Sequence, residues 1–123
     1  MAIEALIVDD QEDIRLLIRR IIDVADAGVC VSGEAATGRE AIECVEELDP
    51  AVIVLDERLP DLDGLQTAKL ILKRRPNQPI ILCSAYVDGE LKRRAQAVGI
   101  SACLPKSELR TLPAAISAAA AAD

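Results

Sequence analysis

The chain has 123 residues, which is enough for one domain with a buried core but too few for two. Its 14 Lys and Arg residues and 21 Asp and Glu residues give a net charge of −7, which disfavours binding of this segment to nucleic acids or anionic lipids. The chain contains no histidine, so it cannot provide a Ser-His-Asp relay, a histidine-based zinc site or a phosphohistidine.

The first half of the chain alternates short apolar runs with longer segments of helical periodicity. Residues 3–8 predict a buried strand, and residues from about 12 to 27 carry apolar side chains at helical spacing. Gly28 is expected to end that helix. Residues 29–35 predict a second strand, and a helix from the Thr37-Gly38 turn to about Leu48 follows it.

The second half repeats this alternation. Residues 51–55 form an uninterrupted apolar run after Asp49-Pro50, as expected for a central parallel strand covered on both faces. The later predicted elements are a loop at 57–64, a helix from Leu65 to about Arg75, a strand at 79–83, a helix at about 89–98, a strand at 100–104 and a helix that starts near Thr111.

Five strand and helix pairs in one uninterrupted series predict a single α/β domain. Parallel strands with right-handed helical connections fold into a three-layer sandwich, with helices on both faces of a five-stranded sheet. We expect the domain to span residues 1–123, and its Ala-rich C-terminal helix could lead into a further output domain.

Chemically active side chains follow four of the predicted strands. Asp9 and Asp10 follow the first strand, Asp56 the third, Ser84 the fourth and Lys106 the fifth. In open α/β sheets, ligands bind beyond the carboxyl ends of the strands, so these side chains are expected to share one site.

Three carboxylates at one sheet edge would repel each other unless a cation neutralises them, and Mg²⁺ prefers such oxygen ligands. A lysine and a hydroxyl across the pocket could stabilise a phosphoryl group in transit, and an unhindered carboxylate could accept it. Asp and Ser at strand ends are often turn formers or helix caps, and a lone lysine is usually a surface charge, but Asp56 closes a fully apolar strand instead of opening a turn. Their occurrence together favours phosphoryl chemistry.

Four segments carry a resemblance to a known family: Val8–Glu12, Leu55–Gly64, Ser84-Ala85 and Leu104–Lys106. In this order and spacing they resemble the characteristic segments of response regulator receiver domains from bacterial two-component systems. The resemblance extends from about Ile3 to the last helix. It implies a flavodoxin-like (βα)5 fold with a parallel sheet of order 2-1-3-4-5.

The resemblance also implies a role for each site residue. Asp56 would be the phosphoacceptor. Asp10 and Asp56 would ligate Mg²⁺ directly together with the backbone carbonyl of Arg58, and Asp9 would act through metal-bound water. Lys106 would pair with the phosphoryl oxygens.

The switch is where the sequence departs from the family. Ser84 would hydrogen-bond the phosphoryl group and start the conformational change, but Cys103 replaces the aromatic residue that usually couples to this hydroxyl. Tyr86 would lie beside the site, as a partner contact or as a passive ring. The Arg58 side chain could contact the phosphoryl group or point to solvent.

The implied function is that of a signalling switch. A sensor histidine kinase or phosphotransfer protein would donate the phosphoryl group, and the surface of the fourth helix, fifth strand and fifth helix would change. The domain would catalyse its own phosphorylation and autodephosphorylation and could dimerise when phosphorylated. The ending Leu104–Ser107 resembles receivers linked to helix-turn-helix output domains. The alternative is a phosphorylation-independent, receiver-like protein-binding module.

The remaining features concern location. Cys30, Cys44, Cys83 and Cys103 are scattered without CxxC pairing, which is typical of free thiols in a reducing compartment. The sequence has neither a secretory signal nor an apolar stretch long enough to span a bilayer. We therefore expect a cytoplasmic protein that contacts neither membranes nor, through this domain, nucleic acid.

Overall fold

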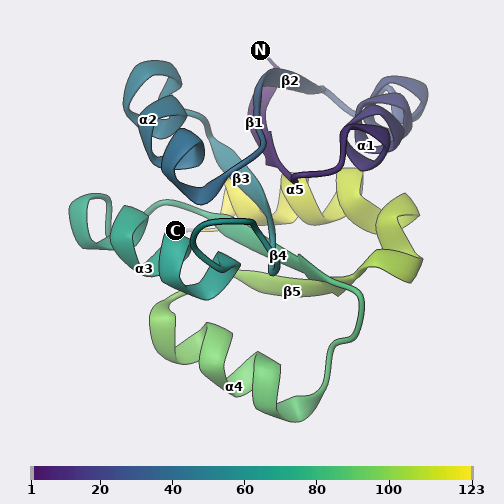
Figure 1. Cartoon of the computed structure of the whole chain (residues 1–123). Coiled ribbons are helices and arrows are strands. Elements are labelled where there is room, and N and C mark those ends of the chain that lie inside the picture. The colour runs from purple at the N-terminus through teal and green to yellow at the C-terminus, as the bar shows by residue number, and fades with distance from the viewer. Residues whose placement is uncertain (1, 123) are drawn as a thin grey trace.

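The computed structural model describes residues 2–122 and contains a five-stranded parallel sheet of order β2-β1-β3-β4-β5 (Figure 1). This confirms the predicted flavodoxin-like fold. The strands are β1 (Ile3–Val8), β2 (Val29–Ala35), β3 (Val52–Asp56), β4 (Ile80–Ser84) and β5 (Ala102–Pro105). The helices are α1 (Glu12–Ala25), α2 (Gly38–Leu48), α3 (Gly64–Arg74), α4 (Gly89–Val98), the 3-10 helix η1 (Lys106–Thr111) and α5 (Leu112–Ala121).

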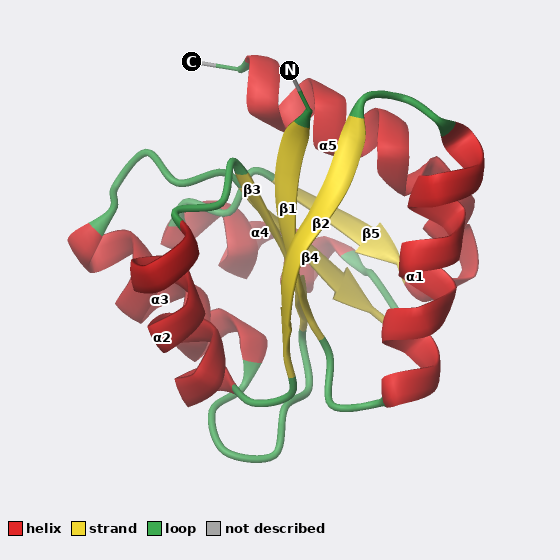
Figure 2. Cartoon of the chain, turned by 90° about the horizontal axis from the view of Figure 1, so that it is seen from above, coloured by secondary structure: helices red, strands yellow, loops and turns green. Residues whose placement is uncertain are grey.

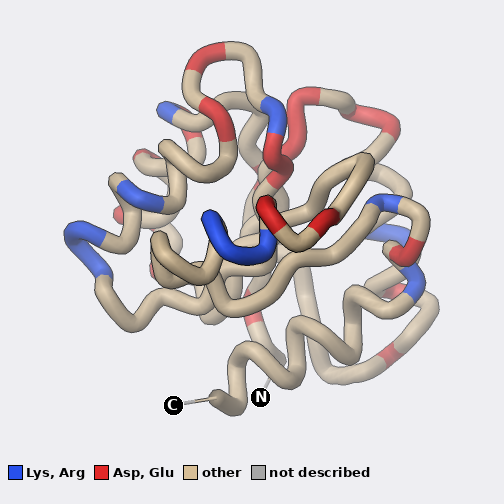
Figure 3. Tube along the Cα trace, turned by 90° about the horizontal axis from the view of Figure 1, so that it is seen from below, with Lys and Arg blue, Asp and Glu red and all other residues tan. Residues whose placement is uncertain are grey.

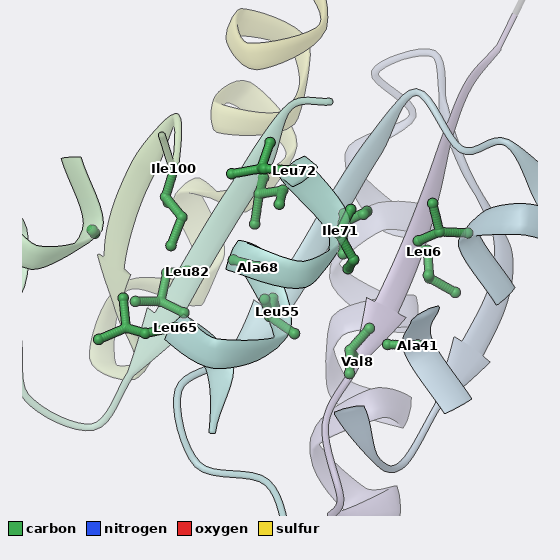
Figure 4. Close-up of a cluster of buried hydrophobic side chains, with 14 of the residues drawn as sticks. Leu6, Val8, Ala41, Leu55, Leu65, Ala68, Ile71, Leu72, Leu82 and Ile100 are labelled. Atoms are coloured by element: carbon green, nitrogen blue, oxygen red, sulfur yellow. The ribbon is translucent and has the colours of Figure 1, made fainter. Parts of the chain in front are cut away.

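Helices cover both faces of the sheet, with α2, α3 and α4 on one side and α1 and α5 on the other (Figure 2). Because side chains alternate along a strand, Leu6 and Val8 of β1 face the α2–α4 layer, whereas Ala5 and Ile7 face α1 and α5. Figure 4 shows the larger cluster, where helix α3 packs on Leu55 and other strand residues. Two apolar layers therefore hold the sheet between the two sets of helices.

The first helix ends earlier than predicted. Helix α1 stops at Ala25 because Asp26 adopts the left-handed conformation with φ 48°, so the prediction that Gly28 ends the helix is wrong. Short polar side chains tolerate this conformation, and Asp49 ends α2 in the same way with φ 46°. Helix η1, which carries Lys106 at its start, was not predicted.

Gly64 joins the loop after β3 to the first turn of α3. A methyl group at Gly64 would lie 2.4 Å from the backbone oxygen of Asp56 and 2.8 Å from the Cα atom of Glu57. Its N–H donates to the carbonyl of Glu57 at 2.7 Å. Glycine is therefore required for close backbone approach, and α3 is anchored directly against the end of β3.

None of the helices between residues 2 and 122 combines the length and the apolar character needed to cross a bilayer.

Candidate functional site

The polar residues predicted from the strand ends lie at one edge of the sheet. Asp9 follows β1, Asp56 and Ser84 end β3 and β4, and Lys106 follows β5. In Figure 3, several segments of Asp and Glu lie close together along the upper edge of the view. A cavity of about 250 Å³ opens here, lined by Asp10, Gln11, Asp56, Glu57, Arg58, Ser84, Ala85 and Lys106.

Three carboxylates converge in this site. Asp9, Asp10 and Asp56 each place a carboxylate oxygen within 4.8 Å of the others. Asp9 and Asp56 are buried, whereas Asp10 is exposed. This donor set fits a hard divalent cation such as Mg²⁺, which prefers carboxylate oxygens and retains water on its open side.

Lys106 bridges the two buried carboxylates. Its Nζ atom lies 3.0 Å from Asp9 Oδ2 and 3.1 Å from Asp56 Oδ1. Burial lowers the pKa of Lys106, but the hydrogen bonds to both carboxylates outweigh it and the net pKa is raised. The ammonium group is therefore held in its charged form beside Asp56.

The carboxyl group of Asp56 is harder to ionise than an ordinary one. Burial and then the charge of Asp9 raise its pKa, and Lys106 and the backbone N–H of Arg58 offset this only in part. A cation bound at the acidic cluster would favour the ionised form that a nucleophile needs.

Arg15 connects the β1–α1 loop, which carries Asp9 and Asp10, to α1 and β2. The sequence did not predict these contacts. Its Nη1 donates to the backbone oxygen of Asp9 at 2.7 Å, and its Nε donates to Glu34 at 2.8 Å. Arg19 also binds Glu34, at 2.6 Å. Burial raises the pKa of Glu34, but hydrogen bonds from the two arginines outweigh burial and lower it. The loop that presents Asp9 is thus fixed to α1 and β2.

Asp61 anchors the loop that follows β3 and was also missed. Its two carboxylate oxygens accept the backbone N–H groups of Gly38, at 2.8 Å, and Arg39, at 3.0 Å. Burial acts to raise the pKa of Asp61, but these and neighbouring N–H groups lower it to about 2. A negative charge at the start of a helix is favourable, so Asp61 attaches the β3–α3 loop to α2.

Ser84 does not point its hydroxyl at Asp56 in this structure. Its Oγ lies 2.5 Å from Glu57 Oε1 and 2.9 Å from the backbone oxygen of Tyr86, and the N–H of Tyr86 donates back to it at 3.3 Å. The predicted contact between Ser84 and a phosphoryl group would require the hydroxyl to turn away from Glu57. Glu57 was not considered in the sequence analysis.

The other predicted residues lie around this centre. The side chain of Arg58 is exposed, and the ring of Tyr86 is 75% exposed. Cys103 is half-buried on β5 opposite Leu82, and burial raises the pKa of its thiol. The roles assigned to these three residues remain predictions.

All four cysteines are free thiols. Cys83, directly beside Asp56 in the β3–β4 register, is buried, and burial together with the charge of Asp56 raises its thiol pKa to about 12. It therefore behaves as a core side chain and not as a nucleophile.

Comparison with known proteins gives a consistent result. Residues 5–117 match the family model described as Response regulator receiver domain. The Chemotaxis protein CheY of Thermotoga maritima is 42% identical over 85 residues, which cover 69% of each chain. A Protein-glutamate methylesterase/protein-glutamine glutaminase of Nitrobacter winogradskyi is 35% identical over 108 residues, which cover 86% of this chain but only 25% of that protein.

Solved structures of response regulators are also similar to this chain. The response regulator domain of Thermotoga maritima CheB superposes with a TM-score of 0.89 at 29% identity, covering 100% of this chain and 99% of that one. A two-component response regulator of the LuxR family from Aurantimonas sp. SI85-9A1 gives 0.92 at 27% identity, covering 98% and 86%.

Proposed function

The chain belongs to the response regulator receiver domain family, and on this basis we propose that it is a phosphoacceptor switch that takes a phosphoryl group onto Asp56 in a Mg²⁺-dependent reaction. The observation that carries the proposal is the convergence of Asp9, Asp10 and Asp56 within 4.8 Å, with Lys106 bonded to two of them. This arrangement supplies an acceptor, a cation site and a fixed positive charge in one place.

The residues present fit the cation. Asp10 and Asp56, with the backbone carbonyl of Arg58, would hold Mg²⁺ directly, and Asp9 would hold it through water. When bound, Mg²⁺ supplies positive charge that neutralises the acidic cluster and the phosphoryl oxygens. The exposure of Asp10 leaves one side of the cluster open to the donor.

The transfer itself needs little from the protein beyond position and charge. A carboxylate oxygen of Asp56 attacks phosphorus, and the bond from phosphorus to the donor histidine nitrogen breaks as the new bond forms. The electron pair of the broken bond stays on the imidazole. Lys106 then pairs with a phosphoryl oxygen, and the Ser84 hydroxyl donates to another.

We assign the donor and the response by family membership. Receiver domains interact with histidine kinases, and we propose a sensor histidine kinase or phosphotransfer protein as the donor. The response would be a changed surface of α4, β5 and α5, and homodimerisation would be one outcome. We place the protein in the cytoplasm, and we expect no contact with membranes or nucleic acid through this domain. The chain spans only about a quarter to a half of several relatives, so any output activity lies outside this proposal.

A second candidate function rests on one observation. Cys103 stands where the family usually places an aromatic residue that couples to the switch hydroxyl. A phosphorylation-independent protein-binding module would retain the fold without the transfer.

A direct phosphorylation assay distinguishes the phosphoacceptor switch from the phosphorylation-independent binding module. Wild-type protein incubated with acetyl phosphate and Mg²⁺ is expected to gain the mass of one phosphoryl group, measured on the intact protein, and EDTA should prevent the gain. Asp10→Ala should abolish the response to Mg²⁺, because it removes one carboxylate ligand. Asp13→Ala removes the same charge from an exposed position on α1 and should behave as wild type. An unmodified wild type in saturating Mg²⁺ would favour the binding module.

A further inference from the structure

We propose that Glu57 is a positioning residue that competes with the phosphoryl group for the hydroxyl of Ser84. The inference rests on the proposed function, since it concerns how the same site responds to a phosphoryl group on Asp56. Its starting point is the 2.5 Å contact between Ser84 Oγ and Glu57 Oε1.

Strand geometry brings these two side chains together. The β3–β4 register pairs Asp56 with Cys83, and the N–H of Glu57 continues the ladder by donating to the carbonyl of Cys83 at 2.8 Å. The next residues, Glu57 and Ser84, are therefore neighbours. They follow Leu55 and Leu82 by two positions, so they belong to the face covered by α3 and α4, while the side chain of Asp56 alternates to the other face.

The hydroxyl of Ser84 has one proton to donate. An ionised carboxylate accepts it more strongly than a neutral carbonyl does, which makes Glu57 a stronger acceptor than the backbone oxygen of Tyr86 at 2.9 Å. Ser84 is only 4% exposed, so water does not readily replace the bond. A phosphoryl oxygen on Asp56 can therefore receive this proton only when Glu57 releases it.

The surrounding space allows that release. Glu57, Arg58, Ser84 and Ala85 line both the cavity at Asp56 and a second cavity of about 280 Å³ that extends to α4. The pair thus stands between the two cavities. The second cavity is also lined by Asp88, Glu90 and Arg94 of the α4 region, and the exposed cation Arg94 can accept the displaced carboxylate. Engagement of Ser84 by a phosphoryl group would in this way turn Glu57 toward α4.

Binding of beryllofluoride, a phosphoryl analogue, with Mg²⁺ tests the competition. Isothermal titration calorimetry measures the affinity, because the ring of Tyr86, the only aromatic residue, is 75% exposed. Glu57→Ala should bind the analogue about tenfold more tightly than wild type, because Ser84 no longer has to leave a charged acceptor. Glu57→Gln keeps the shape with a neutral acceptor and should give a smaller gain of about threefold. Glu47→Ala, which removes a charge from an exposed position on α2 that lines neither cavity, should stay near wild type.

The Ser84→Ala background separates competition from charge repulsion. If Glu57 acts through Ser84, Glu57→Ala should have no effect on affinity in Ser84→Ala protein. An equal gain in both backgrounds, or no gain in Glu57→Ala and Glu57→Gln, would overturn the inference while leaving phosphorylation of Asp56 intact. A wild type that fails to bind the analogue with Mg²⁺ would instead overturn the proposed function and the inference together.

Discussion

Asp56→Asn is expected to abolish covalent phosphorylation and, in metal-free buffer, to unfold at a higher denaturant concentration than wild type. The amide cannot act as the nucleophile that forms an acyl phosphate. It also removes a buried negative charge next to Asp9, while Lys106 keeps its bond to Asp9. Under the proposed function, the site would bind a cation and a phosphoryl group at the expense of stability when both are absent.

The higher stability of Asp56→Asn relative to wild type should depend on pH in a defined direction. Burial and the charge of Asp9 raise the pKa of Asp56 above its ordinary value of 3.8, so ionisation of Asp56 destabilises the folded state. This destabilisation is complete above the raised pKa and disappears below about pH 3.8, where the carboxyl is protonated in folded and unfolded chains alike. Urea unfolding of wild type and Asp56→Asn in EDTA should therefore differ most at neutral pH.

The control for this variant is Asp23→Asn, which removes one charge from an exposed position of α1. It should match wild type in both phosphorylation and unfolding. Added Mg²⁺ should stabilise wild type and Asp23→Asn more than Asp56→Asn, because ligand binding to the folded state adds to its stability. A less stable Asp56→Asn protein at neutral pH in EDTA would contradict the electrostatic account of the site.

Gly64→Ala is expected to lower the free energy of unfolding by about 3 kcal/mol, at the upper end of what overpacking costs. The added methyl group would lie 2.4 Å from the Asp56 backbone oxygen, 2.8 Å from Glu57 Cα and 2.8 Å from Leu82 Cδ1. Two of these neighbours are backbone atoms and cannot rotate away. Relief requires the end of β3 to shift, so phosphorylation of Asp56 should also slow.

Gly89→Ala is the matched control. Gly64 and Gly89 are both the first residue of a helix whose preceding residue, Asp63 or Asp88, caps it. A methyl group at Gly89 would meet only the flexible end of Arg93, at 3.5 Å. Urea unfolding should show Gly89→Ala as stable as wild type or more stable by about 0.5 kcal/mol, since alanine favours the helix. Equal losses in both variants would mean that close packing against Asp56 is not the reason for Gly64.

The sequence was sufficient to predict the fold and the gathering of the candidate site residues at one edge of the sheet. The alternation of apolar runs and helical periodicity indicated five strand and helix pairs, and polar residues stood directly after four of the strands. Asp56 could be located because it closes an apolar strand, and the parallel topology then requires Asp9, Asp10, Ser84 and Lys106 to share its sheet edge.

The contacts between those residues and their surroundings could not be predicted in the same way. The bond between Arg15 and Glu34 joins residues that are 19 positions apart. Asp61 binds the start of α2 across 22 and 23 positions. No local spacing in the sequence indicates such pairs. The bond from Ser84 to Glu57 depends on the β3–β4 register, which fixes the neighbour of each side chain only once the strands are paired. Asp26 ended α1 two residues before the glycine because an aspartate can adopt the same backbone conformation.

Locating the phosphoryl group on the chain would show whether Asp56 carries it, as we propose. Wild-type protein phosphorylated by acetyl phosphate and Mg²⁺ would be reduced with borohydride, which converts an aspartyl phosphate into homoserine. Mass spectrometry of peptides should find homoserine at position 56 and at none of the other aspartates, including Asp9 and Asp10. Homoserine at another aspartate, with Asp56 unchanged, would contradict the account.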